Sequence, residues 1–402
     1  MSNSVEIIAL LSVIVNHSKT QSYLNGLLSI CSALDKLNLF VVRYYYIHKG
    51  KGVFIIKKST TLGMLYFAVH FSVEITSFYV LTSYTDSVYV WWLMLLYDFV
   101  AFVPQGFFGF LRDKNIKINF ALIGTSLTTL SLVLMWLDLN VFLIIVVISL
   151  GNCLIHVHGA ELTLRSSPGK MTPSAVFVAG GSFGLVVGKL MAMHHIPIIF
   201  VLIINLLSLA PIMLAELFKD DDGYDNLKKY RFASNRFSPA VIIALATFVV
   251  AVRAFMGYGI PTAWNKTELQ TILLFFAMGI GKGLGGVLTD KIGIRLTAMI
   301  STIGALPFLI AGENLMFISL LGISIFSMTM AVTLALIVSV LQKYPGVAFG
   351  FTTLGLFLGT SLMFFFRIHS FIVNAILISV LTVLCMLILG MICSKRDKEK
   401  KL

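Results

Sequence analysis

Charged residues are scarce in this chain: they make up only 12% of its 402 residues, about half of their share in soluble globular domains. Hydrophobic residues make up 58% and gather in continuous runs of about 20, long enough to cross a bilayer core about 30 Å thick. A soluble domain of this size would need more polar surface than the sequence supplies. A membrane β-barrel would need apolar and polar residues to alternate, and the continuous apolar runs show no such alternation. The composition therefore predicts a helical membrane protein.

Motifs for covalent, metal and nucleotide chemistry are also missing. No Gly-x-x-x-x-Gly-Lys-(Ser/Thr) loop for ATP occurs, and no nucleophile–base constellation stands out. The cysteines show neither a pairing pattern nor a metal-ligand spacing, so we expect them to be packing residues: Cys31, Cys153, Cys385 and Cys393. We therefore expect no enzyme activity, no cofactor and no metal ion.

The apolar runs divide into twelve predicted membrane-spanning helices. They lie at about 61–83, 88–111, 117–137, 140–163, 173–193, 196–217, 238–260, 267–288, 293–312, 314–341, 346–366 and 369–393. The longest connection, Lys219–Phe237, follows the sixth helix. The sequence thus predicts two six-helix bundles, at 59–217 and 238–393, with a linker at 218–237 and a basic tail at 394–402.

Residues 1–58 come before the first predicted helix. They hold an apolar stretch too short to span a membrane, followed by a basic and aromatic tract from Arg43 to Lys58. Such a tract suits an anionic membrane surface. A flexible extension, or a start codon upstream of the natural one, would also explain the segment, so its role stays open.

Basic residues give the chain a net charge of +12 and fall in every second loop. They are spread over these loops rather than gathered in one patch, so we expect no nucleic-acid partner. Loops rich in Lys and Arg stay on the cytosolic side of a membrane. We therefore predict an even number of spans, with both termini and the linker in the cytosol.

Two short loops, 177 positions apart, carry nearly the same residues. One runs from Gly109 to Lys117 and the other from Gly286 to Arg295, and each contains a glycine, an aspartate and two basic residues at similar offsets. Each loop follows the second helix of its predicted half. A repeated signature of this kind indicates two similar halves.

The signature Gly-x-x-x-Asp-(Lys/Arg)-x-Gly-x-(Lys/Arg) resembles that of the major facilitator superfamily of transporters, over about residues 59–393. The second copy is nearly complete, whereas the first has Ile116 in place of the second glycine. The resemblance implies two bundles that rock about a central site, and loops that gate access to it. The alternative is that the loops are only topology signals. The predicted gating residues are Gly109, Asp113, Lys114, Gly286, Asp290, Lys291, Gly293 and Arg295.

Ionisable residues inside the predicted spans are the best functional clue, because such a residue must pair, face water or lose its charge. We predict proton-coupling or substrate roles for His70, Glu74, Asp98, His156, Arg253 and Lys282. His70 and Glu74 lie four residues apart on one helix face. A carboxyl in a partly dry site can load and unload a proton near neutral pH. Structural ion pairs or satisfied hydrogen bonds are the alternatives.

The basic pair suggests the class of solute. The planar fork of Arg253 suits a carboxylate or phosphate, and Lys282 lies in the next predicted helix. His156 and His158 are two residues apart, and such positions diverge on a helix, so they do not suggest a metal pair.

The sequence therefore predicts an all-α, twelve-helix secondary transporter of the cytoplasmic membrane. It would act as a monomer on a small polar or anionic solute, with protons as the coupling ion and the lipid bilayer around it. Multidrug-type efflux of amphipathic compounds is the first alternative. A non-transporting sensor or scaffold on the same fold, or a membrane-embedded transferase, is the second.

Overall fold

The computed structural model describes residues 58–114, 118–218, 230–259, 267–312, 314–362 and 370–394. Most of the predicted extension, part of the linker and nearly all of the tail lie outside these residues. Within them, the chain is helical apart from connections and one isolated bridge between Ala233 and Cys393. Cys153, Cys385 and Cys393 are buried free thiols.

The first six predicted helices correspond to eight helical elements. These are α3 (Lys58–Ser83), α4 (Val90–Phe102), α5 (Gln105–Asp113), α6 (Phe120–Trp136), α7 (Val141–Arg165), α8 (Thr172–Met193), α9 (Ile198–Leu207) and α10 (Leu209–Leu217). We refer to α3–α10 as the N-terminal half. Pro104 lies between α4 and α5, where its missing N–H and its ring interrupt the helix.

The last six predicted helices correspond to eight more. These are α11 (Pro239–Gly259), α12 (Glu268–Ile292), α13 (Ile294–Ser301), α14 (Leu306–Ala311), α15 (Met316–Ser327), α16 (Thr329–Val340), α17 (Pro345–Leu362) and α18 (Phe371–Ile392). We refer to α11–α18 as the C-terminal half.

Length and hydropathy support a membrane-spanning protein. Eleven helical stretches in the described part are long and apolar enough to cross a membrane. The shorter apolar helix Phe120–Trp136 corresponds to the remaining predicted span. The prediction of an all-α membrane protein is confirmed.

Polar caps set several helix starts. The side chain of Asn119 accepts a hydrogen bond from Leu122 N at the start of α6, and Asn140 accepts from Phe142 N and Leu143 N at the start of α7. Thr267 and Gln270 form a reciprocal capping box at the start of α12. These residues satisfy backbone N–H groups that have no partner within the helix.

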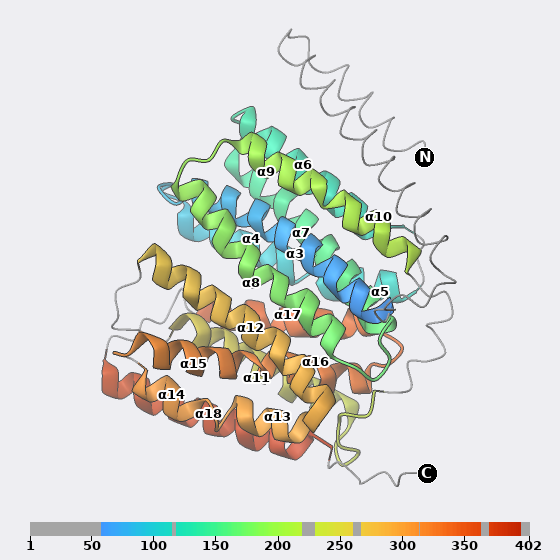
Figure 1. Ribbon diagram of the computed structural model, residues 1–402, viewed down its shortest axis with the longest axis vertical. Coiled ribbons are helices and arrows are strands. Elements are labelled where there is room, and N and C mark those ends of the chain that lie inside the picture. Colours follow the sequence, from blue (N-terminus) through green and yellow to red (C-terminus); the bar gives the residue numbers. More distant parts are fainter. Residues whose placement is uncertain are drawn as a thin grey trace, which may run out of the picture. The chain divides into compact units, whose positions relative to one another are not determined.

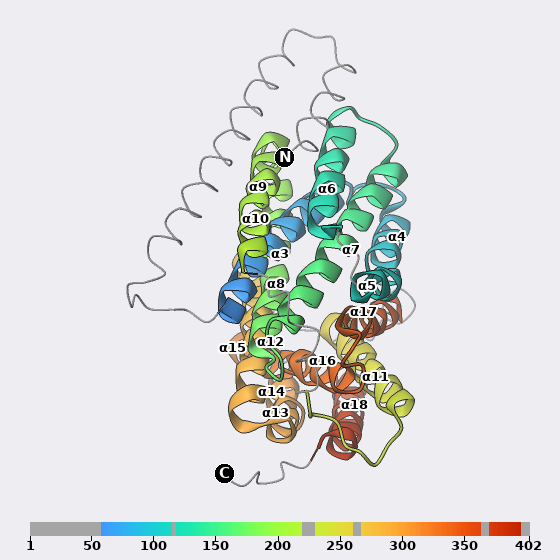
Figure 2. The ribbon, with the colours of Figure 1, turned by 90° about the vertical axis from the view of Figure 1, so that its right-hand side faces the viewer.

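The two halves meet mainly along two helix pairs, and α17 also packs on α4 and α7. The helices of each half pack mainly on one another, while α8 packs on α12 and α5 packs on α17 across the halves. Figures 1 and 2 show α8 beside α12, where the green and gold ribbons adjoin. Because α5 carries Gly109 and Asp113, and α12 carries Gly286 and Asp290, these predicted gating residues lie on helices where the halves touch.

The linker is fastened to both halves where the structure describes it. The buried hydroxyl of Tyr230 donates to the carbonyl oxygens of Leu164 and Ser167, at 2.7 and 2.9 Å. Burial raises the pKa of this phenol, which keeps it a neutral donor. Further along, Ser234 N donates to Ile392 O, at the end of α18. The linker therefore bridges the end of α7 and the end of α18.

Three glycines let α8 lie directly on α3. A Cβ atom at Gly180, Gly184 or Gly188 would overlap a backbone carbonyl oxygen of α3, that of Phe67, Phe71 or Ile75 respectively. Small residues four apart allow this close approach of two helix backbones in a membrane. The seam places α3, with His70 and Glu74, firmly against α8.

Replacing Gly184 by alanine should therefore destabilise the N-terminal half. The added methyl would meet the carbonyl of Phe71 and the Cβ of Glu74, and overpacking of this kind costs about 1–3 kcal/mol. Thermal unfolding of the purified protein measures the effect. Gly390→Ala in α18 is the control, because its Cβ would enter open space and alanine favours a helix. Equal unfolding midpoints for the two variants would contradict the packing argument.

Candidate functional site within and between the two halves

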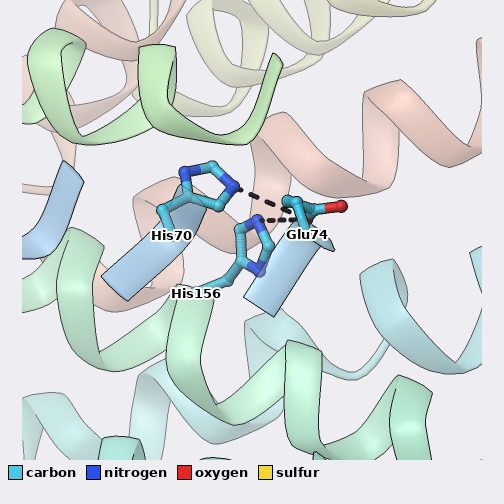
Figure 3. Close-up of side chains that lie close together, drawn as sticks. All are labelled: His70, Glu74 and His156. Carbon is cyan, nitrogen blue, oxygen red and sulfur yellow. Dashed lines mark ion pairs between the residues drawn. The ribbon is translucent and has the colours of Figure 1, made fainter. Parts of the chain in front are cut away.

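His70, Glu74 and His156 form a buried trio in the N-terminal half (Figure 3). The Nε2 atom of His70 lies 3.6 Å from Glu74 Oε1, and the Nε2 atom of His156 lies 3.5 Å from the same oxygen. His70 and Glu74 share one face of α3, as their spacing predicts, and α7 supplies His156. A side chain at Gly181 of α8 would overlap the His70 ring, so this glycine makes room for the imidazole.

Hydrogen bonds to the far side of each ring set the histidine tautomers. His70 Nδ1 lies 2.9 Å from the carbonyl oxygen of Phe177, and His156 Nδ1 lies 2.9 Å from that of Asn152. A carbonyl oxygen only accepts hydrogen bonds, so both Nδ1 atoms carry the proton. In a neutral ring, Nε2 then presents a lone pair to the carboxylate. Two nitrogen lone pairs and a carboxylate oxygen converge, and they need a positive charge, which a proton or a metal ion can supply.

Asn152 holds the carboxylate in place. Its amide nitrogen lies 3.0 Å from Glu74 Oε1, 3.1 Å from Ser77 Oγ and 2.9 Å from the hydroxyl oxygen of Tyr97. Sequence reasoning did not single out Asn152, Ser77 or Tyr97. The only signal was an amide in the middle of an apolar helix, a residue type that bonds to neighbouring helices in membranes.

Asp98 and Lys282 lie on helices that pack against the opposite half. Asp98 is half-buried on α4, which packs on α17. The ammonium of Lys282, on α12, donates to Ser182 Oγ on α8 at 2.8 Å. Both residues therefore lie where elements of different halves meet.

Arg253 lies on α11 with its guanidinium nitrogen 3.4 Å from Met330 Sδ. Its positive charge and the negative charge of Glu74 both act on Lys282, so the predicted acidic and basic residues influence one another. The C-terminal half supplies the two cations and the N-terminal half the two carboxylates.

The aspartates of the duplicated signature form two matching contacts between the halves. Asp113, at the end of α5, accepts from the backbone N–H groups of Gly346 and Val347 at 3.0 and 2.9 Å. These N–H groups belong to the first turn of α17. The helix dipole and unpaired N–H groups of a helix start favour a carboxylate there.

Asp290, near the end of α12, does the same at the start of α8. It accepts from Met171 N, Thr172 N and Thr172 Oγ1 at 2.8, 2.9 and 2.6 Å. We call these two contacts the aspartate clamps. Each clamp joins a helix end of one half to a helix start of the other half. Thr172 was not foreseen, because only its position opposite Asp290 gives it a role.

The predicted gating glycines lie beside the clamps. A Cβ at Gly109 would overlap the backbone of Gly346, and a Cβ at Gly286 would overlap Ala175. Gly293 has a φ of 92°, a backbone conformation that favours glycine, at the turn from α12 to α13.

The predicted basic gating residues lie outside the clamps. The Lys114 ammonium lies 5.3 Å from the centroid of the Phe110 ring. Lys291 and Arg295 are exposed. Exposed basic residues are what we expect if these loops serve to orient the chain in the membrane.

A buried ion network supports the clamp at Asp113. Arg112 donates to Glu161 Oε2 at 3.0 Å, Arg165 donates to Glu161 Oε1, and Arg165 also donates to Asp113 Oδ1 at 3.2 Å. Removing one member of such a buried network leaves an uncompensated charge, which costs about 3–5 kcal/mol. The network therefore fixes Asp113 relative to α7.

Asp290→Asn should open the end of the molecule that the clamps close. The variant loses the charge that holds two backbone N–H groups and one hydroxyl, and a hydrogen bond to a charged group is worth about 1.5–3 kcal/mol. A cysteine at Ala175, in a background whose native cysteines are replaced by alanine, reports the opening, because Ala175 is buried against Gly286. Its maleimide labelling should become at least about tenfold faster.

Lys291→Gln is the matched control, since Lys291 is the exposed neighbour of Asp290. It should leave the labelling rate unchanged. A rate that is equal in Asp290→Asn and the parent protein would show that the clamp does not hold the halves together.

Comparison with known proteins shows similarity of structure only. No family model matches the sequence, and no curated protein matches it. A variant of the Escherichia coli fucose:proton symporter FucP matches with a TM-score of 0.58 at 14% identity, over 83% of this chain and 98% of that chain. The human organic anion transporter MFSD10 (TETRAN) matches with a TM-score of 0.55 at 12% identity, over 84% of this chain and 98% of that one. Both are transporters of the major facilitator superfamily, and this chain has the fold of that superfamily.

Proposed function

We propose that this protein is a secondary transporter that moves a small polar or anionic solute across the cytoplasmic membrane by alternating access, coupled to protons. The observation that carries the proposal is the division of charge between the halves. Glu74 and Asp98 lie in one half, Arg253 and Lys282 in the other, and Asp98 and Lys282 each lie on a helix that packs on the opposite half. A ligand bound among these groups would sense any movement of one half against the other.

The aspartate clamps supply the movable contact. Each consists of hydrogen bonds to a helix start, beside a glycine contact, so the halves can part there without exposing a large apolar surface. The distribution of basic residues assigns this end to the cytosol. The described conformation would then be closed toward the cytosol, and both clamps would break when the cytosolic side opens.

Arg253 and Lys282 are the proposed solute ligands. A guanidinium on α11 and an ammonium on α12 could share one carboxylate or phosphate group of a solute, and charge-assisted hydrogen bonds of this kind are the strong ones. The fold is shared with a fucose:proton symporter and an organic anion transporter. Those names support a polar or anionic solute and a proton, and they do not identify which solute.

Asp98 is the proposed proton carrier. It is half-buried on α4, which packs on α17 of the opposite half, so rocking of the halves would change its access to water. Glu74 is more enclosed, because Asn152 and two histidines surround its carboxylate. A carboxyl that alternates between dry and wet surroundings can bind and release a proton in each cycle.

Reconstitution into liposomes tests the function. Labelled sugars, carboxylates and amino acids are offered with and without an imposed pH gradient, in the presence and absence of a protonophore. We expect one solute class to accumulate only with the gradient. Accumulation of an amphipathic cation instead would favour multidrug-type efflux, and no accumulation of any solute would favour a sensor or scaffold.

Asp98→Asn should uncouple transport from the proton. Uptake driven by the pH gradient should fall to the level of protein-free liposomes, because an amide cannot carry the proton. Exchange of solute across the membrane, which needs no net proton movement, should persist. Asp138→Asn makes the same chemical change at an exposed loop residue and should keep both activities. Gradient-driven uptake by Asp98→Asn at the parent rate would exclude Asp98 as the carrier.

Arg253→Gln and Lys282→Gln should weaken solute binding. Losing one hydrogen bond to a charged group should raise KM for an anionic solute about 10- to 100-fold. Lys189→Gln, near the end of α8, is the control and should leave KM within about twofold. Solute transport is the measurement. An unchanged KM in both Arg253→Gln and Lys282→Gln would contradict the proposal that the solute is anionic.

A further inference from the structure

We propose that His70, Glu74 and His156 bind one divalent transition-metal ion of the zinc class. The proposal goes beyond transport and does not depend on it. The sequence predicted no metal site, because the spacing of residues along the chain does not show which helices pack together. The packing of α3 against α7 creates a ligand set that no sequence spacing displays.

The distances fit a metal ion after a small adjustment. The three ligand atoms all lie within 4.8 Å of one another, and the two nitrogen-to-oxygen distances are 3.5 and 3.6 Å. Ligands about 2.0–2.1 Å from a tetrahedral zinc ion are about 3.3 Å apart. The two nitrogen-to-oxygen distances therefore need to shorten by only a few tenths of an ångström, and the two nitrogens, which lie within 4.8 Å of each other, need to approach by at most about 1.5 Å. Two histidines and one glutamate also leave a fourth position for water or another ligand.

The surrounding hydrogen bonds orient all three ligands. Each histidine donates its Nδ1 proton to a backbone carbonyl, Phe177 O for His70 and Asn152 O for His156. This fixes the rings with Nε2 toward the centre of the trio. The Asn152 amide in turn holds Glu74. Partners of this kind set the tautomer and direction of metal-bound histidines and are part of established metal sites.

A single proton does not satisfy the trio as well as a metal ion does. If a proton on His70 Nε2 bonds to Glu74, the lone pair of His156 still faces the same carboxylate at 3.5 Å. A metal ion accepts an electron pair from all three ligand atoms at once. The site is also enclosed, with His70 and His156 each 5% exposed. Water therefore does little to weaken the repulsion between the two nitrogen lone pairs and the carboxylate oxygen.

Neighbouring charges both favour and oppose the ion. Asp98 interacts with Glu74 and adds a second negative charge to the region. Lys282, in the C-terminal half, opposes a cation in the trio, and Arg253 acts on Lys282 from the same half. The ion would therefore be held by its bonds to the three ligands more than by the electrostatic field of the surrounding charged residues.

Metal binding to the full chain tests the proposal. The protein is purified with a tag that contains no histidine, treated with chelator, and titrated with Zn²⁺ against a chromophoric competitor and with Co²⁺ by absorption. We expect one ion per chain and a tetrahedral Co²⁺ spectrum. His70→Gln, Glu74→Gln and His156→Gln should each lower the affinity at least about 100-fold.

Two histidines outside the trio provide matched controls. His158 is buried two residues farther along α7 with its ring stacked on Tyr66, and His194 is exposed and paired with Glu268. His158→Gln and His194→Gln should keep the affinity of the parent protein. His156→Cys should add a sulfur-to-cobalt charge-transfer band, which locates the ion in the trio even if the glutamine variants fold poorly.

Several results would overturn the proposal. These are a parent protein that binds less than one ion per chain, equal affinity in the parent and the trio variants, and a His156→Cys spectrum without the sulfur band. Binding is measured without solute or gradient, so such a failure leaves the transport proposal standing. Transport that fails while the ion binds would contradict transport alone.

Discussion

Charged side chains inside membrane-spanning helices have no lipid partner, and the packing of this protein follows from that constraint. Moving such a charge to the bilayer centre costs about 2.5–3.5 kcal/mol even on the more permissive scales. Glu74 accordingly meets two histidines and an asparagine, and Glu161 meets two arginines. These polar contacts fix α3 and α5 against α7 more specifically than apolar packing can, since lipid and leucine are almost equivalent neighbours.

The two halves are joined by a different kind of contact. Asp113 and Asp290 each occupy the start of a helix in the opposite half, and a glycine lies beside each of them. Such a contact is strong while it is closed, yet it involves few side chains, and water can replace every hydrogen bond in it. Tight polar networks within a half and replaceable polar contacts between halves are what a rocking mechanism requires.

The buried residues at the centre differ in how they would respond to such rocking. The trio lies wholly within one half, on α3 and α7, so its geometry stays constant as the halves move. Lys282 bonds across the halves to Ser182, and Asp98 lies on α4 where it packs on α17, so their surroundings would change. A fixed trio suits a bound ion, whereas groups that change surroundings suit a proton and a solute that must be released. The metal-ion proposal therefore uses the trio as ligands, whereas the transport proposal assigns the proton to Asp98 and the solute to Arg253 and Lys282.

The sequence by itself determined the membrane class, the helices and the important aspartates. Runs of about 20 apolar residues admit little besides a membrane-spanning helix, and the duplicated signature marked Asp113 and Asp290 without showing what they touch. It also paired His70 with Glu74, because residues four apart share a helix face. Only the tertiary structure brought in His156, Asn152 and Thr172, since contacts between helices depend on their relative rotation and depth. Those two quantities are set by the glycine seams and buried polar contacts of the whole fold, and no local spacing encodes them.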